Sequence, residues 1–131
     1  MILHHATAET FEHFDLRFLG NGENHANGAL GVWLAVSDSW ISGFGANVLD
    51  VETDFSSTMT MTPTELRKIA ADAWKLDIDA VEHHAEVRRK LMEKGFDSIA
   101  IVEDGGAIDM YVAMDLDKVR IVNRRGTEAV I

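Results

Sequence analysis

Two helix-start signals stand next to each other in the middle of the chain, with short strand patterns on both sides of them. The first is Thr62-Pro63-Thr64-Glu65, which has a capping threonine, proline at the first helical position and glutamate three residues after the cap. The second is Asp79 followed by Glu82, and Gly95 is a natural stop beyond it. Because strands and helices do not alternate regularly, this order predicts an α+β fold with a largely antiparallel sheet.

The expected strands are short and mostly apolar. In the first half we expect a strand at 2–5 that leads into a turn at 6–8, a buried strand at 30–36 and an alternating strand at 47–54, which 58–61 prolongs or follows. In the second half the expected strands are 96–102, 108–114 and 119–122, with a turn at 103–106. The residues from Arg124 onward are expected to fray.

Each of the two helices is expected to bury one apolar face. In the first this face is formed by Leu66, Ile69, Ala70 and Ala73, and in the second by Ile78, Val81, Ala85, Leu91 and Met92. His83 and His84 are expected on the surface of the second helix. The glycine-rich and asparagine-rich stretch 20–31 predicts a loop. Ser37 or Asp38 is expected to cap a short helix that carries Trp40, Ile41 and Phe44.

Length and composition indicate a single domain over residues 1–131. The hydrophobic content of 47% argues against general disorder. The absence of cysteine excludes disulfides, thiolate metal sites and a cysteine nucleophile. No apolar run approaches the length of about 18 residues that spans a membrane, and the first residues lack the features of a signal peptide. We therefore expect a cytoplasmic protein without membrane contact.

The chain is acidic, with a formal net charge of -10. That charge argues against direct binding of nucleic acid, and it suits either a basic protein partner or a solvated acidic surface. The charge is also unevenly distributed, because from Met1 to Glu65 the only cation is Arg17, against nine carboxylates. An anionic ligand bound by this half therefore has to use Arg17, a helix N-terminus or backbone amides.

Several familiar site motifs are absent. The histidine pairs His4-His5 and His83-His84 lack the spacing of a helical metal site, so we expect no bound metal. The sequence has no Gly-x-Ser-x-Gly elbow, no Gly-Lys-Ser/Thr after its glycine loop and no dinucleotide fingerprint.

The most informative local feature is Gly31-Val32-Trp33, where a glycine loop leads into a strand whose third residue is a large aromatic. Phe44 follows eleven residues after Trp33. Two aromatic rings placed in this way either sandwich a flat ligand ring or pack in the core.

Short motifs at both ends of the chain share their order with a known family. They are Leu3-His4-His5-Ala6-Thr7, Phe14-Asp15-Leu16, Leu19-Gly20-Asn21-Gly22-Glu23, Gly31-Val32-Trp33-Leu34, Gly95-Phe96-Asp97-Ser98-Ile99 and Tyr111-Val112-Ala113-Met114-Asp115. In order and spacing they resemble the ADP-ribosyltransferases, in particular the short versions found in phages and in bacterial polyvalent proteins. The chain departs from the family pattern where Ala6 replaces a glycine and Trp33 replaces a tyrosine, and Asn24 and Ala29 likewise replace loop glycines.

The resemblance implies a split, mostly antiparallel sheet core with flanking helices, and NAD as the bound cofactor. It implies that His5 hydrogen-bonds the ribose, that Thr7 supports the following loop and that the Ala6 backbone pairs with the nicotinamide carboxamide. The remaining cofactor contacts that it implies are stacking by Trp33 and Phe44, close backbone approach at Gly31 and a pyrophosphate contact from Arg17.

The resemblance also implies a carboxylate that binds the ribose and stabilises the cation-like sugar as the glycosidic bond breaks. The family usually has a glutamate there, and Asp109 is the candidate in this chain, with His5 as its catalytic partner. Glu103 and Asp115 are alternatives to Asp109, and Glu23 is a candidate for contacting the acceptor.

Two functional hypotheses follow. The first is a mono-ADP-ribosyltransferase that modifies a bacterial host protein, acting in the host cytoplasm and in counter-defence such as anti-CRISPR if a phage encodes it. The second is a non-catalytic acidic binding protein or inhibitor with the same fold, which the net charge and the aspartate in place of glutamate favour. Hydrolysis of NAD, or a nucleotide or nucleic-acid acceptor, is a third possibility.

Overall fold

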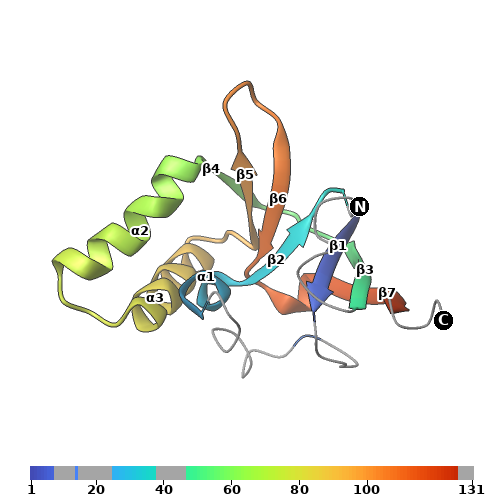
Figure 1. Cartoon of the computed structure of the whole chain (residues 1–131), viewed down its shortest axis with the longest axis horizontal. Coiled ribbons are helices and arrows are strands. Elements are labelled where there is room, and N and C mark those ends of the chain that lie inside the picture. The colour runs from blue at the N-terminus through green and yellow to red at the C-terminus, as the bar shows by residue number, and fades with distance from the viewer. Residues whose placement is uncertain (8–13, 15–24, 38–46, 127–131) are drawn as a thin grey trace.

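The centre of the sheet joins strands that are far apart in the sequence. A computed structural model describes residues 1–7, 14, 25–37 and 47–126 (Figure 1). Its strands form one 7-stranded sheet in the order β4-β5-β6-β2-β1-β3-β7. The strands are β1 (Ile2–Thr7), β2 (Val32–Ala35), β3 (Asn47–Thr53), β4 (Thr58–Met61), β5 (Ser98–Val102), β6 (Ile108–Ala113) and β7 (Val119–Gly126).

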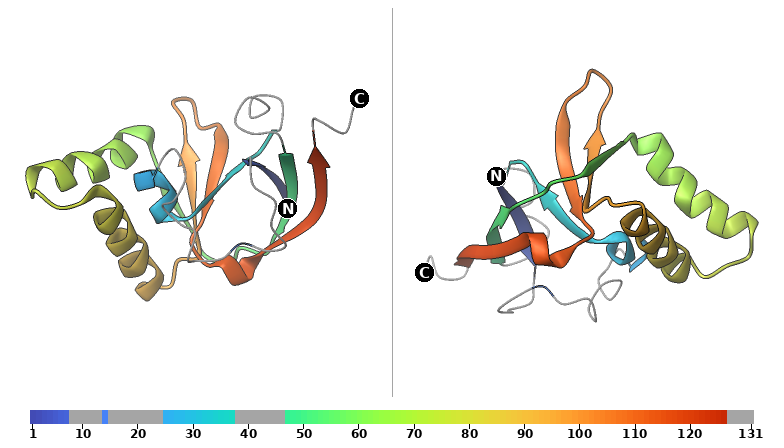
Figure 2. Two further views of the ribbon diagram at one scale, coloured as in Figure 1. Left: turned by 60° about the horizontal axis from the view of Figure 1, so that its bottom comes forward. Right: turned by 180° about the vertical axis from the view of Figure 1, so that it is seen from behind.

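All neighbouring strands in this sheet are antiparallel except β4 and β5. The α-helices of the described residues are α1 (His25–Leu30), α2 (Pro63–Lys75) and α3 (Ala80–Glu93). The helices gather at the β4–β5–β6 end of the sheet, whereas β1, β3 and β7 lie at the other end (Figures 1 and 2). The α+β class with a mostly antiparallel sheet is therefore confirmed.

Two apolar clusters lie on opposite faces of the sheet, because successive side chains of a strand point to opposite sides. The helix-side cluster joins the sheet to all three helices and consists of Leu30, Met61, Ile69, Leu91, Ile99, Ile101, Val112 and Met114. The second cluster consists of Leu3, Val32, Leu34, Leu49, Val51 and Ala113, with Phe14, Phe55 and Tyr111 packed against it. The sheet is thus buried on both faces, and either face has a core of its own.

The two long helices begin where the sequence predicts. Thr62 accepts a hydrogen bond from the backbone N–H of Glu65, whose side chain accepts from the Thr62 N–H, and this reciprocal pair is a capping box. Asp79 caps α3 by accepting from the N–H of Glu82 at 3.0 Å. The chain leaves α3 through Gly95, which has a φ of 96° that favours glycine.

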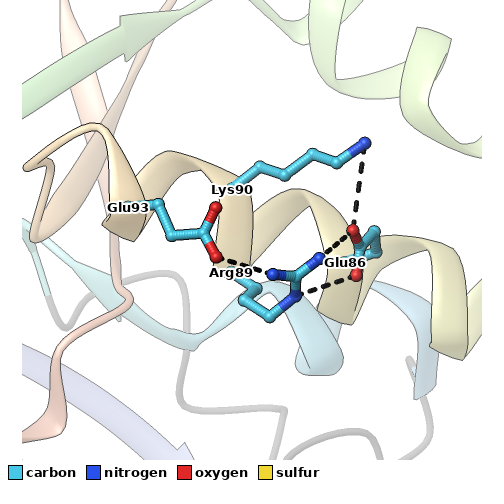
Figure 3. Close-up of polar contacts among 4 residues, drawn as sticks. All are labelled: Glu86, Arg89, Lys90 and Glu93. Carbon is cyan, nitrogen blue, oxygen red and sulfur yellow. Dashed lines mark hydrogen bonds and ion pairs between the residues drawn. The ribbon is translucent and has the colours of Figure 1, made fainter.

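The outer face of α3 carries a set of ion pairs (Figure 3). Arg89 pairs with Glu86 and, at 2.6 Å, with Glu93, while the Lys90 ammonium lies 3.8 Å from Glu86. On the inner side, the Arg88 guanidinium donates to the carbonyl of Met114 at 3.0 Å and so fastens α3 to the segment after β6.

The structure corrects the prediction of a loop over 20–31, because residues 25–30 form helix α1. The helix forms although Asn27 and Gly28 disfavour it, because Ala29 and Leu30 are buried and α1 packs against α3. Two strands also extend further than expected. β1 continues through Ala6 and Thr7 instead of turning, and β7 includes Arg124 and Arg125, since both segments are paired with β3 along their length.

The expected surface position of His84 is wrong. Its side chain is 0% exposed, and its Nδ1 lies 2.7 Å from the carbonyl of Ala80, one turn earlier in the helix. Neighbouring helical residues diverge by about 100°, so only one of the two histidines can face the interior. The apolar face of α3 is rotated accordingly, because Ala85 is exposed while His84 and Leu91 are buried, and Ile78, which lies before the helix, is exposed as well.

None of the helices in the described residues is long and apolar enough to cross a membrane.

Candidate functional site

Three of the motifs that are distant in the sequence meet on three adjacent strands. His5 lies on β1, Gly31 and Trp33 lie at the start of β2, and Asp109 and Tyr111 lie on β6, and the sheet order places β2 between the other two. Among the described residues, the candidate site therefore lies in the middle of the sheet.

His5 is held by the neighbouring strand. Its Nδ1 lies 2.8 Å from the carbonyl oxygen of Trp33, and the ring meets Phe14 edge-on with centroids 5.5 Å apart. Burial lowers the pKa of His5, and the hydrogen bond to the Trp33 carbonyl opposes that effect only in part. The ring is therefore neutral near pH 7. Because a carbonyl accepts only from an N–H, Nδ1 is the protonated nitrogen and Nε2 keeps a lone pair.

The strand register places His5 and Tyr111 on one face, and Asp109 lies further along the strand that carries Tyr111. His4 pairs with Ala35, so His5 is level with Leu34, which pairs with Tyr111. Asp109 lies two residues before Tyr111, at an irregularity in the pairing of β6 with β5, where Met110 pairs with Ile101 but Ile108 pairs with Val102. Its carbonyl accepts from the Val36 N–H at 2.9 Å, and its side chain is exposed. The Cα atoms of His5 and Asp109 are two strands and two residues apart, roughly 12 Å.

Trp33 and Ala6 lie on the other face of the same strands. The Trp33 ring packs against the helix-side cluster, and Ala6 packs against Ala35 and Val48. The structure therefore brings the carbonyl of Trp33 to His5 but places its indole across the sheet. Thr7 has the parity of His5 and pairs with Asn47 at the end of β1.

Gly31 is required by the packing of the sheet. A Cβ atom added there would lie 2.4 Å from the carbonyl oxygen of Ala113 and 2.8 Å from a methyl group of Val112. The close backbone approach expected at this position is thus made by β6, which lies directly against the start of β2.

Of the three candidate carboxylates, only Asp109 lies on a strand in the centre of the sheet, two strands from His5. Glu103 is exposed in the β5–β6 turn, where its N–H donates to the carbonyl of Ala107. Asp115 follows β6, and its side chain accepts from the Asp117 N–H at 3.1 Å. Arg17, Glu23 and Phe44 lie outside the described residues.

One aromatic pair on the His5 face escaped the sequence analysis. Phe55 stacks on Tyr111 with ring centroids 6.1 Å apart and an interplanar angle of 26°. Tyr111 belongs to the last of the quoted motifs, but Phe55 follows β3 and carries no sequence signal of its own. Tyr111 is two residues from Asp109 on β6, and the face that holds His5 thus also holds flat apolar rings.

The sequence matches no protein-family model and no curated protein. In overall structure the chain is similar to the crystal structure of an anti-CRISPR protein, with a TM-score of 0.49 and 13% sequence identity. The similarity covers 93% of this chain and 95% of that chain. A similarity at this level does not assign an activity to the chain.

A second polar cluster lies on the opposite face and explains His4. Its Nδ1 lies 2.8 Å from Asp50, which also accepts from Asn123 at 3.0 Å and from Arg125 at 2.7 Å. Burial alone would raise the pKa of Asp50, but the hydrogen bonds from Asn123, Arg125 and His4 outweigh it and lower the pKa. His4 therefore ties β1 to β3 and β7. Within the described ranges, no three His, Asp or Glu side chains gather around a possible metal position.

Proposed function

We propose that this chain is an NAD-dependent mono-ADP-ribosyltransferase that modifies a protein of a bacterial host. The observation that carries the proposal is the convergence of the His5, Gly31–Trp33 and Asp109–Tyr111 segments on adjacent strands. These segments were selected by their resemblance to the transferases, and nothing in their sequence separation requires that they meet.

The neutral form of the His5 ring is suited to a hydrogen bond from a ribose hydroxyl. The neutral ring has its Nδ1 proton committed to the Trp33 carbonyl, so Nε2 accepts a hydrogen bond from a sugar hydroxyl. In this arrangement Trp33 contributes the carbonyl that orients His5. In the part of the chain that the structure describes, the rings of Phe14, Phe55 and Tyr111 lie on this face, beside the proposed position of the nicotinamide.

Asp109 supplies the negative charge that the reaction needs. The bond between C1′ of the ribose and the nicotinamide nitrogen breaks, and nicotinamide leaves with the electron pair. The sugar then carries positive charge, which a nearby carboxylate stabilises. A nucleophilic side chain of the acceptor protein forms the new bond to C1′ and releases its proton to solvent.

The test is transfer of label from NAD to protein in a bacterial lysate. We expect wild type to label a discrete protein band, and His5→Asn and Asp109→Asn to abolish the labelling. Asp104→Asn is the matched control, because Asp104 is an exposed aspartate in the β5–β6 turn. Thermal unfolding of each variant shows whether a loss of labelling reflects a loss of folding. Unchanged labelling in both site variants would overturn the assignment.

The acidic charge supports a second candidate, a non-catalytic binding protein or inhibitor. It requires a stoichiometric, unmodified partner and no NAD binding by calorimetry, whereas the transferase requires NAD binding and a partner whose mass rises by one ADP-ribose. For either candidate, a phage-encoded counter-defence role such as anti-CRISPR is part of the proposal, and it predicts that the modified or bound protein belongs to the host defence system.

A further inference from the structure

The corner between α2 and α3 exposes an apolar surface. Trp74 is 87% exposed, Leu76 is 62% exposed and Ile78 is 43% exposed. We call these three residues the Trp74 patch. The corner lies at the end of the molecule farthest from β7 (Figures 1 and 2), so the patch is remote from the face that carries His5.

The backbone around the patch is held in place. The N–H groups of Leu76, Asp77 and Ile78 donate to the carbonyls of Asp72, Trp74 and Ala73 at 3.0, 3.2 and 3.0 Å. Asp77 takes a left-handed conformation with a φ of 54°, which ends the helix sharply. The exposed side chains are therefore presented by an ordered turn, so a partner that binds them has little chain to order.

A hollow of about 380 Å³ lies beside Trp74, between the end of α2 and the start of α3. Its apolar lining comes from Trp74, Ile78 and three alanines, Ala70, Ala73 and Ala80. Asp77 and Asp79 complete the lining. The corner thus offers a projecting aromatic ring and, next to it, a hollow suited to an apolar side chain.

The fold of the chain does not account for the Trp74 side chain. A tryptophan removes up to about 250 Å² from water when it is buried, and here the ring stays almost wholly in solvent. Exposed apolar patches of this kind mark interaction sites, and tryptophan is among the residues most enriched where binding energy concentrates.

The charged residues around the Trp74 patch indicate what kind of partner it binds. Between Ala70 and Glu82 the chain has four carboxylates, Asp72, Asp77, Asp79 and Glu82, and one cation, Lys75. A second copy would bring the same excess of negative charge, which opposes self-association. We propose that the Trp74 patch docks a protein partner whose apolar anchor is flanked by Lys and Arg side chains. This docking does not depend on the use of NAD.

The test selects a displayed library of random peptides on the immobilised protein, without NAD, after removal of peptides that bind Trp74→Ala. We expect the recovered peptides to combine a large apolar residue with flanking Lys or Arg. The best synthetic peptide should bind Trp74→Ala at least about 10-fold more weakly than wild type. Its affinity should also fall as salt rises.

Two variants separate charge from structure. Asp77→Asn and Asp79→Asn together remove two carboxylates, while asparagine tolerates the left-handed turn and caps a helix as well as aspartate does. We expect this double variant to weaken the peptide and to flatten its salt dependence. Val122→Ala is the control, because Val122 is an exposed apolar residue on β7, and it should leave the affinity unchanged.

Three outcomes would overturn the proposal. The first is failure to recover any peptide that distinguishes wild type from Trp74→Ala, and the second is recovery of peptides without an excess of basic residues. The third is a wild-type dimer in sedimentation that Trp74→Ala converts to monomer, because it would assign the patch to a second copy of the chain.

Discussion

The ring of His5 has one polar atom engaged by the protein and one left for a ligand. This arrangement depends on the neutral form, because a second proton would place a charge in the apolar surroundings of Leu34 and Leu49. The neighbouring His4 shows the contrast on the other face, where a carboxylate accepts from its ring. Adjacent histidines of one strand thus have unrelated environments.

The pKa of His5 predicts a pH effect on stability. Because folding lowers this pKa, the unfolded chain takes up the proton first as pH falls. The contribution of neutral His5 is therefore complete above its ordinary pKa of about 6.5 and is lost as pH falls below it. Urea unfolding at about pH 7 and about pH 5 should show a loss of stability in wild type that is smaller in His5→Asn.

The carboxylates with lowered pKa values titrate in a lower pH range, so they do not account for a difference in stability between about pH 7 and about pH 5. The lowered pKa values of Asp50 and Asp97 mean that their contributions persist above the ordinary aspartate pKa of about 3.9 and disappear only below it. If wild type and His5→Asn lose the same stability between about pH 7 and about pH 5, the inference that His5 is buried in its neutral form is wrong.

Asp97 illustrates a residue whose role was not visible in the sequence. The segment 95–99 was selected because it resembles a motif of the transferases. In the structure, the buried Asp97 of this segment accepts hydrogen bonds from Ser56, Ser57 and Ser98. Burial would raise its pKa, but these hydrogen bonds outweigh that effect. The side chain therefore anchors the loop before β4 to the strand beside it. Such a role depends on a partner 40 residues away in the sequence.

At the scale of elements, local chemistry predicts the long helices well and the short one poorly. Thr62 and Asp79 cap their helices through contacts three residues away, so the information lies within one turn. Helix α1 is only six residues long and contains Asn27 and Gly28, which disfavour a helix. It forms because Leu30 is buried against a helix that begins 50 residues later, and single-segment propensity contains nothing about that contact.

Caps and surface ion pairs should differ in their effect on stability. Thr62→Ala removes the acceptor of the Glu65 N–H and should lower the free energy of unfolding by about 1 kcal/mol. Glu86→Gln breaks the ion pairs with Arg89 and Lys90 on the outer face of α3, and it should cause little measurable change in the free energy of unfolding. Chemical denaturation of both variants checks the ranking, and a larger effect for Glu86→Gln would contradict it.

At the scale of the whole molecule, the sequence indicates the fold class but not the order of the strands. Alternating and apolar runs locate most strands, whereas their neighbours depend on contacts across the whole chain. The arrangement of the candidate site likewise depends on contacts between distant parts of the chain. Resemblance selected His5, Trp33 and Asp109, but only the register shows that the Trp33 indole lies across the sheet from His5.

Two cores that share one sheet should unfold together. Leu30 belongs to the helix-side cluster and Leu34 to the opposite one, and both are 0% exposed. Leu30→Ala and Leu34→Ala should each cost about 2–5 kcal/mol, with a single transition that tryptophan fluorescence and far-ultraviolet circular dichroism report at the same denaturant concentration. Separate transitions in either variant would show that the two faces are independent units.

The position of β1 has a consequence for biosynthesis. It is synthesised before the other strands of this sheet, yet it lies inside the sheet between β2 and β3, and β2 in turn pairs with β6, which is synthesised much later. The nascent chain therefore has to keep an apolar strand unpaired until its partners are made, and the site is completed only when β6 emerges. Translation sets the earliest moment at which His5 and Asp109 come together, so fragments that end before β6 are expected to need chaperones and to lack the candidate site.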